Sequence, residues 1–241
     1  MSGATAITGR IHSIQSLGTL DGPGIRYVIF TQGCPLRCRC CHNPDTWALE
    51  GGAVYTPSEL IARALRFREY FGREGGITLS GGEPLLQAEF AAELFRLAHG
   101  AGIGTCLDTS GCILTDAAKA LLLHTDRVLL DIKYTSDADY RAFVGCGMDA
   151  PMAFLSYLNK RGIPTTLRQV ILPTVNDSEG SIGALREIAR SHSCVDKVEL
   201  LPFRKLCTVK YEGMGIPFPF AHIPEPTREQ MAYLEGLLKN E

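Results

Sequence analysis

Three cysteines, Cys34, Cys38 and Cys41, have the spacing Cys-x3-Cys-x2-Cys within one short loop, residues 33–43. An iron–sulfur cubane normally takes one thiolate for each of its four irons. Three thiolates leave one iron without a protein ligand, in the way that a catalytic zinc site keeps one coordination position open. Such an iron could bind a small molecule and promote its cleavage, so this segment is a candidate cluster loop.

Two other kinds of site compete with an open cluster. A structural zinc site prefers four ligands in two paired halves, and the sequence has no second Cys-x2-Cys pair. A fully ligated electron-transfer cluster would need a fourth cysteine ligand. Apart from Cys40, the other cysteines are scattered along the chain: Cys106, Cys112, Cys146, Cys194 and Cys207. The cysteine pattern alone favours the open cluster and leaves both alternatives standing.

Further residues with chemical potential lie at or after the ends of β-rich runs. In chain order they are Ser80-Gly81-Gly82-Glu83, Asp108-Thr109, Asp131 with Lys133, Arg168, and Arg204. The carboxyl ends of parallel strands are where barrels and open α/β sheets keep their chemistry. Their shared position therefore indicates one functional edge.

Each of these motifs also has an ordinary structural explanation. A Gly-Gly pair after a strand is usually a tight turn, and Asp108 could cap a turn or a helix. Asp131 and Lys133 alternate to the same face of their strand, where they could form a simple ion pair. Arg168 stands among apolar residues, so its charge needs an anionic or carbonyl partner.

Strand and helix signals alternate along the whole chain and would position these residues. The predicted strands cover residues 25–30, 76–79, 103–107, 127–132, 165–172 and 197–201. The predicted helices cover 57–71, 86–99, 116–123, 140–159 with a break at Pro151, 181–191, and a last helix that starts at Thr227. Six β/α units imply a parallel sheet and are too few for a closed eight-stranded barrel. We predict an α/β fold, an open partial (β/α)6 barrel in a single domain over residues 1–241, with a doubly wound sheet as the alternative.

The composition limits the cellular compartment of the protein and the classes of partner that it can bind. The 241 residues are 45% hydrophobic, enough for one sizeable core, and the net charge of −2 gives no global field for nucleic acid. No apolar segment is long enough to span a bilayer, and residues 1–10 show no export signal. Nine cysteines, two of them adjacent, do not form a secreted disulfide framework. We expect a cytoplasmic protein, and an exposed cluster would require low oxygen.

Over nearly its whole length the sequence resembles the pyruvate formate-lyase activating enzymes, a family of glycyl-radical-enzyme activases in the radical S-adenosylmethionine (SAM) superfamily. The cysteine spacing resembles radical SAM enzymes in general, whereas Asp21-Gly22-Pro23-Gly24-Ile25-Arg26 and Cys41-His42-Asn43 point to the activases. The other segments of the resemblance are 9–13, 44–47, 80–83, 106–109, 130–133 and 200–203. Only residues 42–79 separate Cys41 from Ser80, which leaves no room for the ferredoxin-like module inserted in other activases.

The resemblance implies that Cys34, Cys38 and Cys41 hold a [4Fe–4S] cluster whose fourth iron binds SAM. An electron from flavodoxin or ferredoxin would cleave SAM to methionine and a deoxyadenosyl radical. That radical would take an α-hydrogen from a glycine of the partner enzyme, pyruvate formate-lyase. The protein would thus be a monomeric oxidoreductase of anaerobic metabolism, acting on neither nucleic acid nor membrane.

The resemblance also implies the remaining site residues. Those expected to bind SAM are Cys40, His42, Asn43, Gly81, Gly82, Glu83, Asp131, Lys133, Val170 and Arg204. A monovalent-cation site would use Asp108, Thr109, Asp131 and the backbone carbonyl of Leu129. Asp21 and Arg168 would engage the glycine-bearing loop of the partner enzyme.

Two positions depart from the family pattern. The family usually has an aromatic residue where this chain has Cys40, and a histidine that contacts the nucleoside of SAM where it has Arg204. Arginine can still donate hydrogen bonds and stack on adenine, but it is longer and always charged. Three other functions stay open: activation of a different glycyl-radical enzyme, radical SAM chemistry on a small metabolite, and electron transfer without SAM cleavage.

Overall fold

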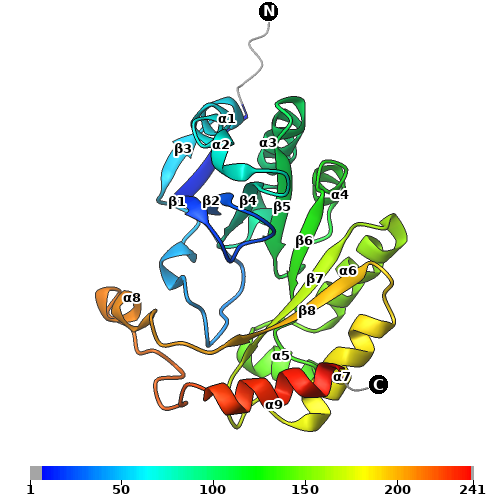
Figure 1. Cartoon of the computed structure of the whole chain (residues 1–241). Helices are drawn as coiled ribbons and strands as arrows, with labels where there is room; N and C mark the ends of the chain where they lie inside the picture. Colours follow the sequence, from blue (N-terminus) through cyan, green and yellow to red (C-terminus); the bar gives the residue numbers. More distant parts are fainter. Residues whose placement is uncertain (1–6, 240–241) are drawn as a thin grey trace, which may run out of the picture. The chain divides into compact units, whose positions relative to one another are not determined.

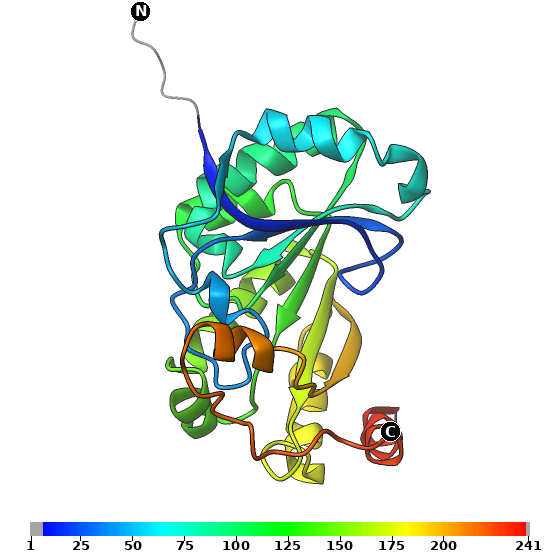
Figure 2. The same ribbon diagram turned by 90° about the vertical axis from the view of Figure 1, so that its left-hand side faces the viewer.

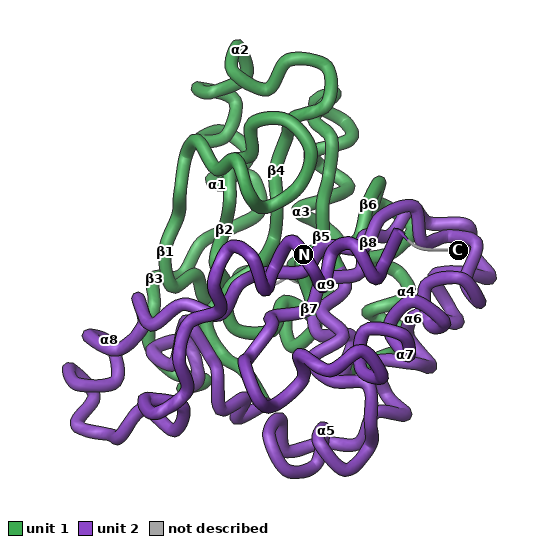
Figure 3. The backbone as a smooth tube through the Cα atoms, turned by 60° about the horizontal axis from the view of Figure 1, so that its bottom comes forward, with its two compact units in different colours: residues 1–35, 48–109, 113–129 green, residues 36–47, 110–112, 130–241 purple. Residues whose placement is uncertain are grey.

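The computed structural model describes residues 7–239, so six of the ten residues in which we expect no export signal lie outside the described part. The chain divides into two compact units (Figure 3). Unit 1 runs to Pro35 and continues over 48–109 and 113–129. Unit 2 comprises 36–47, 110–112 and the chain from Leu130 onward. The cluster loop is thus divided between the units, with Cys34 in unit 1 and the following cysteines in unit 2.

Eight strands follow the order β3-β1-β2-β4-β5-β6-β7-β8. Their bounds are β1 Gly9–Gly18, β2 Arg26–Thr31, β3 Ala53–Tyr55, β4 Gly76–Gly81, β5 Gly104–Thr109, β6 Arg127–Asp131, β7 Thr165–Ile171 and β8 Val195–Pro202. Different strands stand at the two ends of this order, so the sheet is open. The predicted open α/β fold and all six predicted strands are confirmed.

Two strands were not predicted, β1 and β3, and both pair antiparallel. In β1 the apolar residues Ile11, Ile14 and Leu17 recur every third position, which is a helical rather than a strand period. The register of β1 against β2 shifts between Ile11 and Ser13, as at a β-bulge, and this irregularity removes the simple alternation.

The helices of unit 1 are α1 (Pro57–Leu65), α2 (Arg68–Phe71), the 3-10 turn η2 (Pro84–Gln87), α3 (Ala88–Gly100) and α4 (Asp116–Leu122) (Figure 1). The predicted helix 57–71 is therefore two helices, because Phe67 leaves the helical conformation. The capping box of α1 is present: Thr56 accepts from the Glu59 N–H, and the Glu59 carboxylate accepts from the Thr56 N–H.

The helices of unit 2 are η1 (Pro44–Thr46), α5 (Asp137–Phe143), α6 (Asp149–Arg161), α7 (Glu179–Arg190), α8 (Thr208–Gly213) and α9 (Arg228–Lys239). The break predicted within 140–159 lies between α5 and α6, and Pro151 falls in the first turn of α6, where proline is tolerated. The short helix α8 was not predicted. Among residues 7–239, no helix combines the length and apolar character needed to cross a bilayer.

The parallel strands carry the core. Nearly every residue of β2, β4 and β7 is buried, as expected for strands with both faces covered. Three predicted site residues close their strands: Gly81 closes β4, Thr109 closes β5 and Asp131 closes β6. These residues therefore lie at strand ends, whereas Arg168 lies inside β7.

Candidate active site

Backbone hydrogen bonds hold the unit 2 part of the cluster loop. The N–H groups of Arg37 and Arg39 donate to the carbonyls of Val144 and Phe143, at 3.1 and 2.9 Å. The Cys41 N–H donates to the Cys38 carbonyl at 3.1 Å and closes a turn between the two cysteines. The loop therefore enters this turn as an extended segment anchored to the end of α5.

The cysteines of the loop differ in exposure. Cys34, Cys38 and Cys41 are half-buried thiols without disulfides, whereas Cys40 is buried and only 9% exposed. Burial raises the pKa of the Cys40 thiol to about 11. Within residues 7–239, no three His, Cys, Asp or Glu side chains form a metal-ligand group in this protein-only structure.

The surroundings of Cys41 fit a cluster-bound sulfur. Burial raises the pKa of Cys41, while the backbone N–H of Asn43 and the indole N–H of Trp47 lower it. The Trp47 Nε1 atom is buried and makes no well-aligned hydrogen bond within residues 7–239, so its contact with the Cys41 sulfur is a loose one. Hydrogen bonds to cysteine sulfur stabilise the charge of an iron–sulfur cluster and tune its potential. A buried N–H beside this thiol, with no other acceptor among the described residues, therefore fits a metal-bound thiolate.

Asp131 and Lys133 form an ion pair at the end of β6, as their alternation allowed. Burial would lower the pKa of Lys133, but Asp131 and the thiols of Cys38 and Cys40 outweigh it and raise that pKa well above its usual value. The Lys133 N–H donates to the Tyr140 hydroxyl at 2.9 Å and fixes the backbone here. A half-buried lysine whose charge is favoured by Asp131 thus lies near the cluster loop within unit 2.

His42 contacts Arg204, and it does so through the Arg204 backbone rather than through the guanidinium. The His42 Nε2 lies 2.9 Å from the Arg204 carbonyl, which only accepts, so the proton is on Nε2. Burial lowers the pKa of His42, and the charges of Lys133 and Lys210 lower it further. The Arg204 guanidinium instead pairs with Glu225 at 2.7 Å.

Arg168 and Val170 lie on β7. Arg168 is 9% exposed, and its Nε is 3.7 Å from a carboxylate oxygen of Glu199. Glu199 is directly opposite Arg168 in the parallel pairing of β7 with β8. The anionic partner expected for Arg168 is therefore present. Val170 is half-buried, and its carbonyl accepts from the Asn176 amide at 2.8 Å.

In unit 1, Gly81, Gly82 and Glu83 form a tight turn after β4. Gly81 has φ +111°, and a Cβ there would lie 2.4 Å from the Thr31 nitrogen, so only glycine fits. The N–H of Glu83 donates to the Gly33 carbonyl at 2.8 Å, next to the first cluster cysteine. The turn is thereby tied to the start of the cluster loop.

Glu83 itself is buried and oriented. Its Oε1 accepts from the Thr109 hydroxyl at 2.6 Å and from the Leu85 N–H at 3.1 Å, and the residue is 1% exposed. The neighbouring Asp108 accepts from the Ser80 hydroxyl at 2.7 Å. The structure thus brings the motifs at the ends of β4 and β5 together through side-chain hydrogen bonds.

Asp21 lies in the turn before β2. Its carbonyl accepts from the Thr78 hydroxyl at 2.7 Å, and the Thr78 oxygen accepts from Arg26 Nε at 2.9 Å. Arg26 is 1% exposed, and burial lowers its pKa. A buried arginine therefore fixes the backbone of a predicted partner-binding residue.

Sequence reasoning missed several residues that hold the site. Glu199 could have been found, because it lies in a predicted strand and pairs with a buried arginine. Glu225 carried no such signal, since it acts from an irregular segment. Trp47 lies in the resemblance segment 44–47, but nothing in the sequence placed its indole beside Cys41. Lys210 and Tyr211 were missed together with α8.

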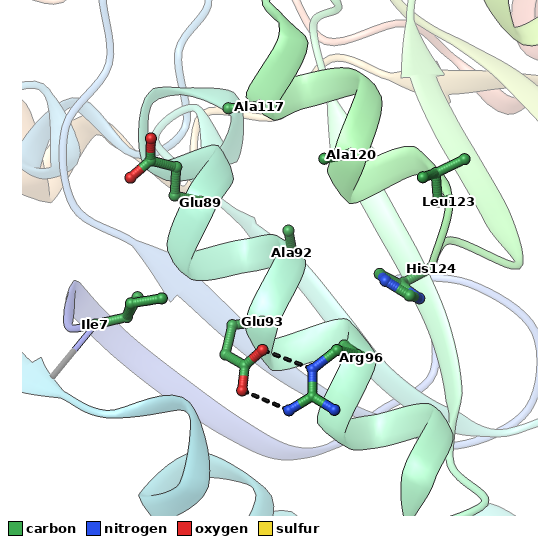
Figure 4. A pocket seen from close by; sticks show the side chains of 9 residues that line it. All are labelled: Ile7, Glu89, Ala92, Glu93, Arg96, Ala117, Ala120, Leu123 and His124. Atoms are coloured by element: carbon green, nitrogen blue, oxygen red, sulfur yellow. Dashed lines mark hydrogen bonds and ion pairs between the residues drawn. The ribbon is translucent and has the colours of Figure 1, made fainter. Parts of the chain in front are cut away.

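A hollow of about 320 Å³ lies elsewhere in unit 1, lined by residues of α3, of α4 and of the segments beside them (Figure 4). Glu93 and Arg96 pair across its edge at 2.7 Å, and none of the predicted site residues lines it. It is therefore not the site described above.

The comparisons with known proteins assign the family. Residues 28–182 match the radical SAM superfamily. The chain is 44% identical to the pyruvate formate-lyase-activating enzyme of Clostridium pasteurianum over 97% of this chain and 98% of that protein. It is 38% identical to the pyruvate formate-lyase 1-activating enzyme of Escherichia coli K12, over 97% and 96%. The chain belongs to the pyruvate formate-lyase activating enzymes of the radical SAM superfamily.

Solved structures of radical SAM proteins agree with this fold. A radical SAM methyltransferase from Sphaerobacter thermophilus aligns with a TM-score of 0.65 and 21% identity, over 89% of this chain and 63% of that one. A domain of a pyruvate formate-lyase-activating enzyme from Bacteroides vulgatus aligns with a TM-score of 0.57 and 20% identity, over 68% and 92%. At these identities the likeness shows the fold alone. Members of this superfamily use a [4Fe–4S] cluster and SAM.

Proposed function

We propose that this activase generates the glycyl radical of pyruvate formate-lyase. One electron and SAM would give methionine and a deoxyadenosyl radical. The radical would then take one hydrogen atom from the glycine Cα, leaving deoxyadenosine and the stored radical on the partner enzyme. The observation that carries the proposal is the similarity to pyruvate formate-lyase-activating enzymes over 97% of the chain.

Cys34, Cys38 and Cys41 would hold the cluster, which when bound supplies the electron that cleaves the sulfonium. Their half-burial supports this assignment, since a ligand to a reactive cluster must be reachable yet shielded. The N–H groups that face Cys41 would stabilise its charge in the bound state. Cys40, buried and protonated, would line the SAM site as an apolar side chain.

Glu83 and Lys133 would recognise the methionine end of SAM. Two donors hold the Glu83 carboxylate, so it would accept from the SAM ammonium with little reorganisation. Lys133, kept charged by Asp131, would donate to the polar groups of SAM. Gly81 and Gly82 would allow close backbone approach.

The other end of SAM would lie near four residues of unit 2. His42 and Asn43 follow the last cluster cysteine, Val170 lies near the end of β7, and Arg204 follows β8. Because the Arg204 guanidinium is engaged by Glu225, we propose that its backbone carbonyl orients His42 while its side chain contributes little to SAM binding.

A monovalent cation would bind beside SAM through Asp108, Thr109, Asp131 and the Leu129 carbonyl. These are hard oxygen ligands, which suit such ions. Asp108 and Thr109 are adjacent at the end of β5, and each carries a hydrogen bond to a neighbouring site residue.

Asp21 and Arg168 would bind the glycine-bearing loop of the partner. The fixed backbone at Asp21 and the ion pair of Arg168 with Glu199 support preformed contacts. We further propose one radical SAM domain without an inserted ferredoxin-like module. It would work as a monomer in the cytoplasm of an anaerobically growing cell, with flavodoxin or ferredoxin as reductant.

The test is reductive SAM cleavage by anaerobically reconstituted protein. Dithionite and SAM should yield deoxyadenosine and methionine in equal amounts. Alanine at Cys34, Cys38 or Cys41 should abolish both the cluster absorption and the products, whereas Cys146→Ala, a half-buried cysteine outside the loop, should keep both. Absence of cleavage by the loaded wild-type protein would contradict radical SAM chemistry in this chain.

A further inference from the structure

The short helix α8 lies against the segment that leaves the cluster loop. Its contacts are with η1, the turn at Pro44–Thr46 directly after the predicted SAM residues. In Figures 1 and 2 the orange helix α8 stands beside this blue segment, and both belong to unit 2. No role has so far been given to this helix.

Lys210 of α8 reaches the loop with its amine. The Nζ donates to Asn43 Oδ1 at 2.8 Å and to Asp45 Oδ1 at 3.0 Å. A lysine amine only donates, so this bond fixes which end of the Asn43 amide faces α8. The amide nitrogen is the end turned away from Lys210 and is presented as a donor.

Tyr211, the next residue of α8, bonds to the same segment at Cys41, ahead of Asn43 and Asp45. Its hydroxyl donates to the Cys41 carbonyl at 3.3 Å, and the side chain is 1% exposed. Its ring meets the Trp47 ring edge-on, with centroids 6.0 Å apart.

The positive charge of Lys210 lies beside the segment that leaves the cluster loop. Its Nζ is bonded to the side chain of Asn43, two residues after Cys41. Asp45 takes part of this charge, but both partners of the pair are partly buried, with Lys210 33% and Asp45 30% exposed. Screening by water is therefore incomplete.

We infer that Lys210 is a positioning residue for SAM and for the cluster. It holds the Asn43 amide in one orientation before the nucleoside arrives, and its positive charge favours the reduced, more negative cluster. The inference rests on the proposed function. It adds a residue of α8 that touches neither the cluster ligands nor the reacting atoms.

A purely structural role would have a different signature. A partly exposed ion pair of this kind contributes little to folding stability. We therefore expect Lys210→Met to fold with nearly the wild-type thermal midpoint. A change in cluster or SAM properties in that variant would not come from unfolding.

The test uses reconstituted holoprotein and two readouts, SAM affinity and the midpoint potential of the cluster. Lys210→Met should bind SAM about tenfold more weakly, the size expected for loss of one charge-assisted hydrogen bond, and should show a lower potential. Lys210→Arg, which keeps the charge, should restore the potential. Lys205→Met is the control, because Lys205 donates to the Ala221 carbonyl and should show wild-type values.

A double-mutant cycle tests whether Lys210 acts through Asn43. The double variant Asn43→Ala, Lys210→Met should bind SAM no more weakly than Asn43→Ala alone. Fully additive losses, or wild-type affinity and potential in Lys210→Met, would overturn the inference. If Lys210→Met assembles no cluster, Lys210→Gln is used in its place. Lys210→Gln should lower the midpoint potential of the cluster and lose less SAM affinity than expected for Lys210→Met. Wild-type affinity and potential in Lys210→Gln would likewise overturn the inference. A wild-type protein that binds no SAM would instead contradict the proposed function.

Discussion

Cys40 lies next to the predicted cluster ligand Cys41, but its surroundings do not suit an iron ligand. Cys40 lies in the turn closed by the Cys41 N–H to Cys38 carbonyl bond, and the structure buries Cys40 while Cys38 and Cys41 stay half-buried. Burial keeps the Cys40 thiol protonated, with its pKa raised to about 11, whereas an iron ligand must be a thiolate. The cluster should therefore not need Cys40.

We predict that Cys40→Ser binds as much iron and sulfide per chain as the wild-type protein, whereas Cys38→Ser loses both. Metal analysis after anaerobic reconstitution checks this. The alternative is that Cys40 captures an iron when oxygen damages the cluster. The test is the rate at which the cluster of Cys40→Tyr decays in air, monitored by absorbance. A rate equal to that of the wild-type protein rules this role out.

Thr174 carries backbone strain in the turn after β7. Its φ of 67° is the only positive value at a non-glycine residue within 7–239. The left-handed region costs a residue with a Cβ about 1–2 kcal/mol, and the Thr174 N–H is held there by Asp177 at 2.8 Å.

Thr174→Gly should therefore raise the free energy of unfolding by about 0.5–1 kcal/mol, after the greater chain entropy of glycine is subtracted. Thr174→Ala keeps a Cβ in the strained conformation and should gain little. Urea denaturation of the two variants measures the difference. A loss of stability in Thr174→Gly would show that the turn depends on the threonine side chain.

At the scale of elements, the turn at residues 21–24 depends on Arg26. Besides Thr78, its guanidinium donates to the carbonyls of Glu74 at 3.1 Å and of Ile77. One side chain thus joins the turn, β2, β4 and the segment before β4. A lysine amine cannot replace this planar fork of donors.

We predict that Arg26→Lys lowers the free energy of unfolding by about 2–4 kcal/mol, because several buried acceptors lose their donor. The exposed Arg66 provides the matched control, and Arg66→Lys should stay within about 0.5 kcal/mol of wild type. Chemical denaturation of both variants gives the comparison. Equal stabilities would mean that the turn does not depend on the guanidinium.

Elements with a regular pattern could be predicted from the sequence, and irregular ones could not. The six predicted strands are short, apolar and bounded by turn residues, so their pattern identifies them. In β1 a bulge replaces alternation by a three-residue period. Helix α8 spans only Thr208–Gly213, ends in glycine and has too few positions to show a helical period.

At the scale of the whole molecule, the residues proposed for the site are assigned to both units. Cys34, Gly81 to Glu83, Asp108 and Thr109 belong to unit 1, whereas Cys38 to Asn43, Asp131, Lys133, Val170 and Arg204 belong to unit 2. The motifs could be predicted because strand ends and cysteine spacing are local. Their partners, such as Glu225 for Arg204, are distant in the sequence and leave no local signal.

A ligand that binds the folded state and not the unfolded state must stabilise the folded protein. We predict that SAM at about 100 times its dissociation constant stabilises the reconstituted protein by about 2.7 kcal/mol. Thermal unfolding under anaerobic conditions, with methionine as the control ligand, measures this as a higher midpoint. An unchanged midpoint at saturating SAM would contradict binding to the native state.

We expect this chain to place a radical on a glycine of pyruvate formate-lyase. The direct measurement is electron paramagnetic resonance of reduced holoprotein with SAM and pyruvate formate-lyase, run beside a partner whose radical-site glycine is replaced by alanine. We expect a glycyl radical signal that matches the amount of deoxyadenosine released and that is absent with the alanine partner. Deoxyadenosine without any glycyl radical would contradict it and direct the search to another substrate.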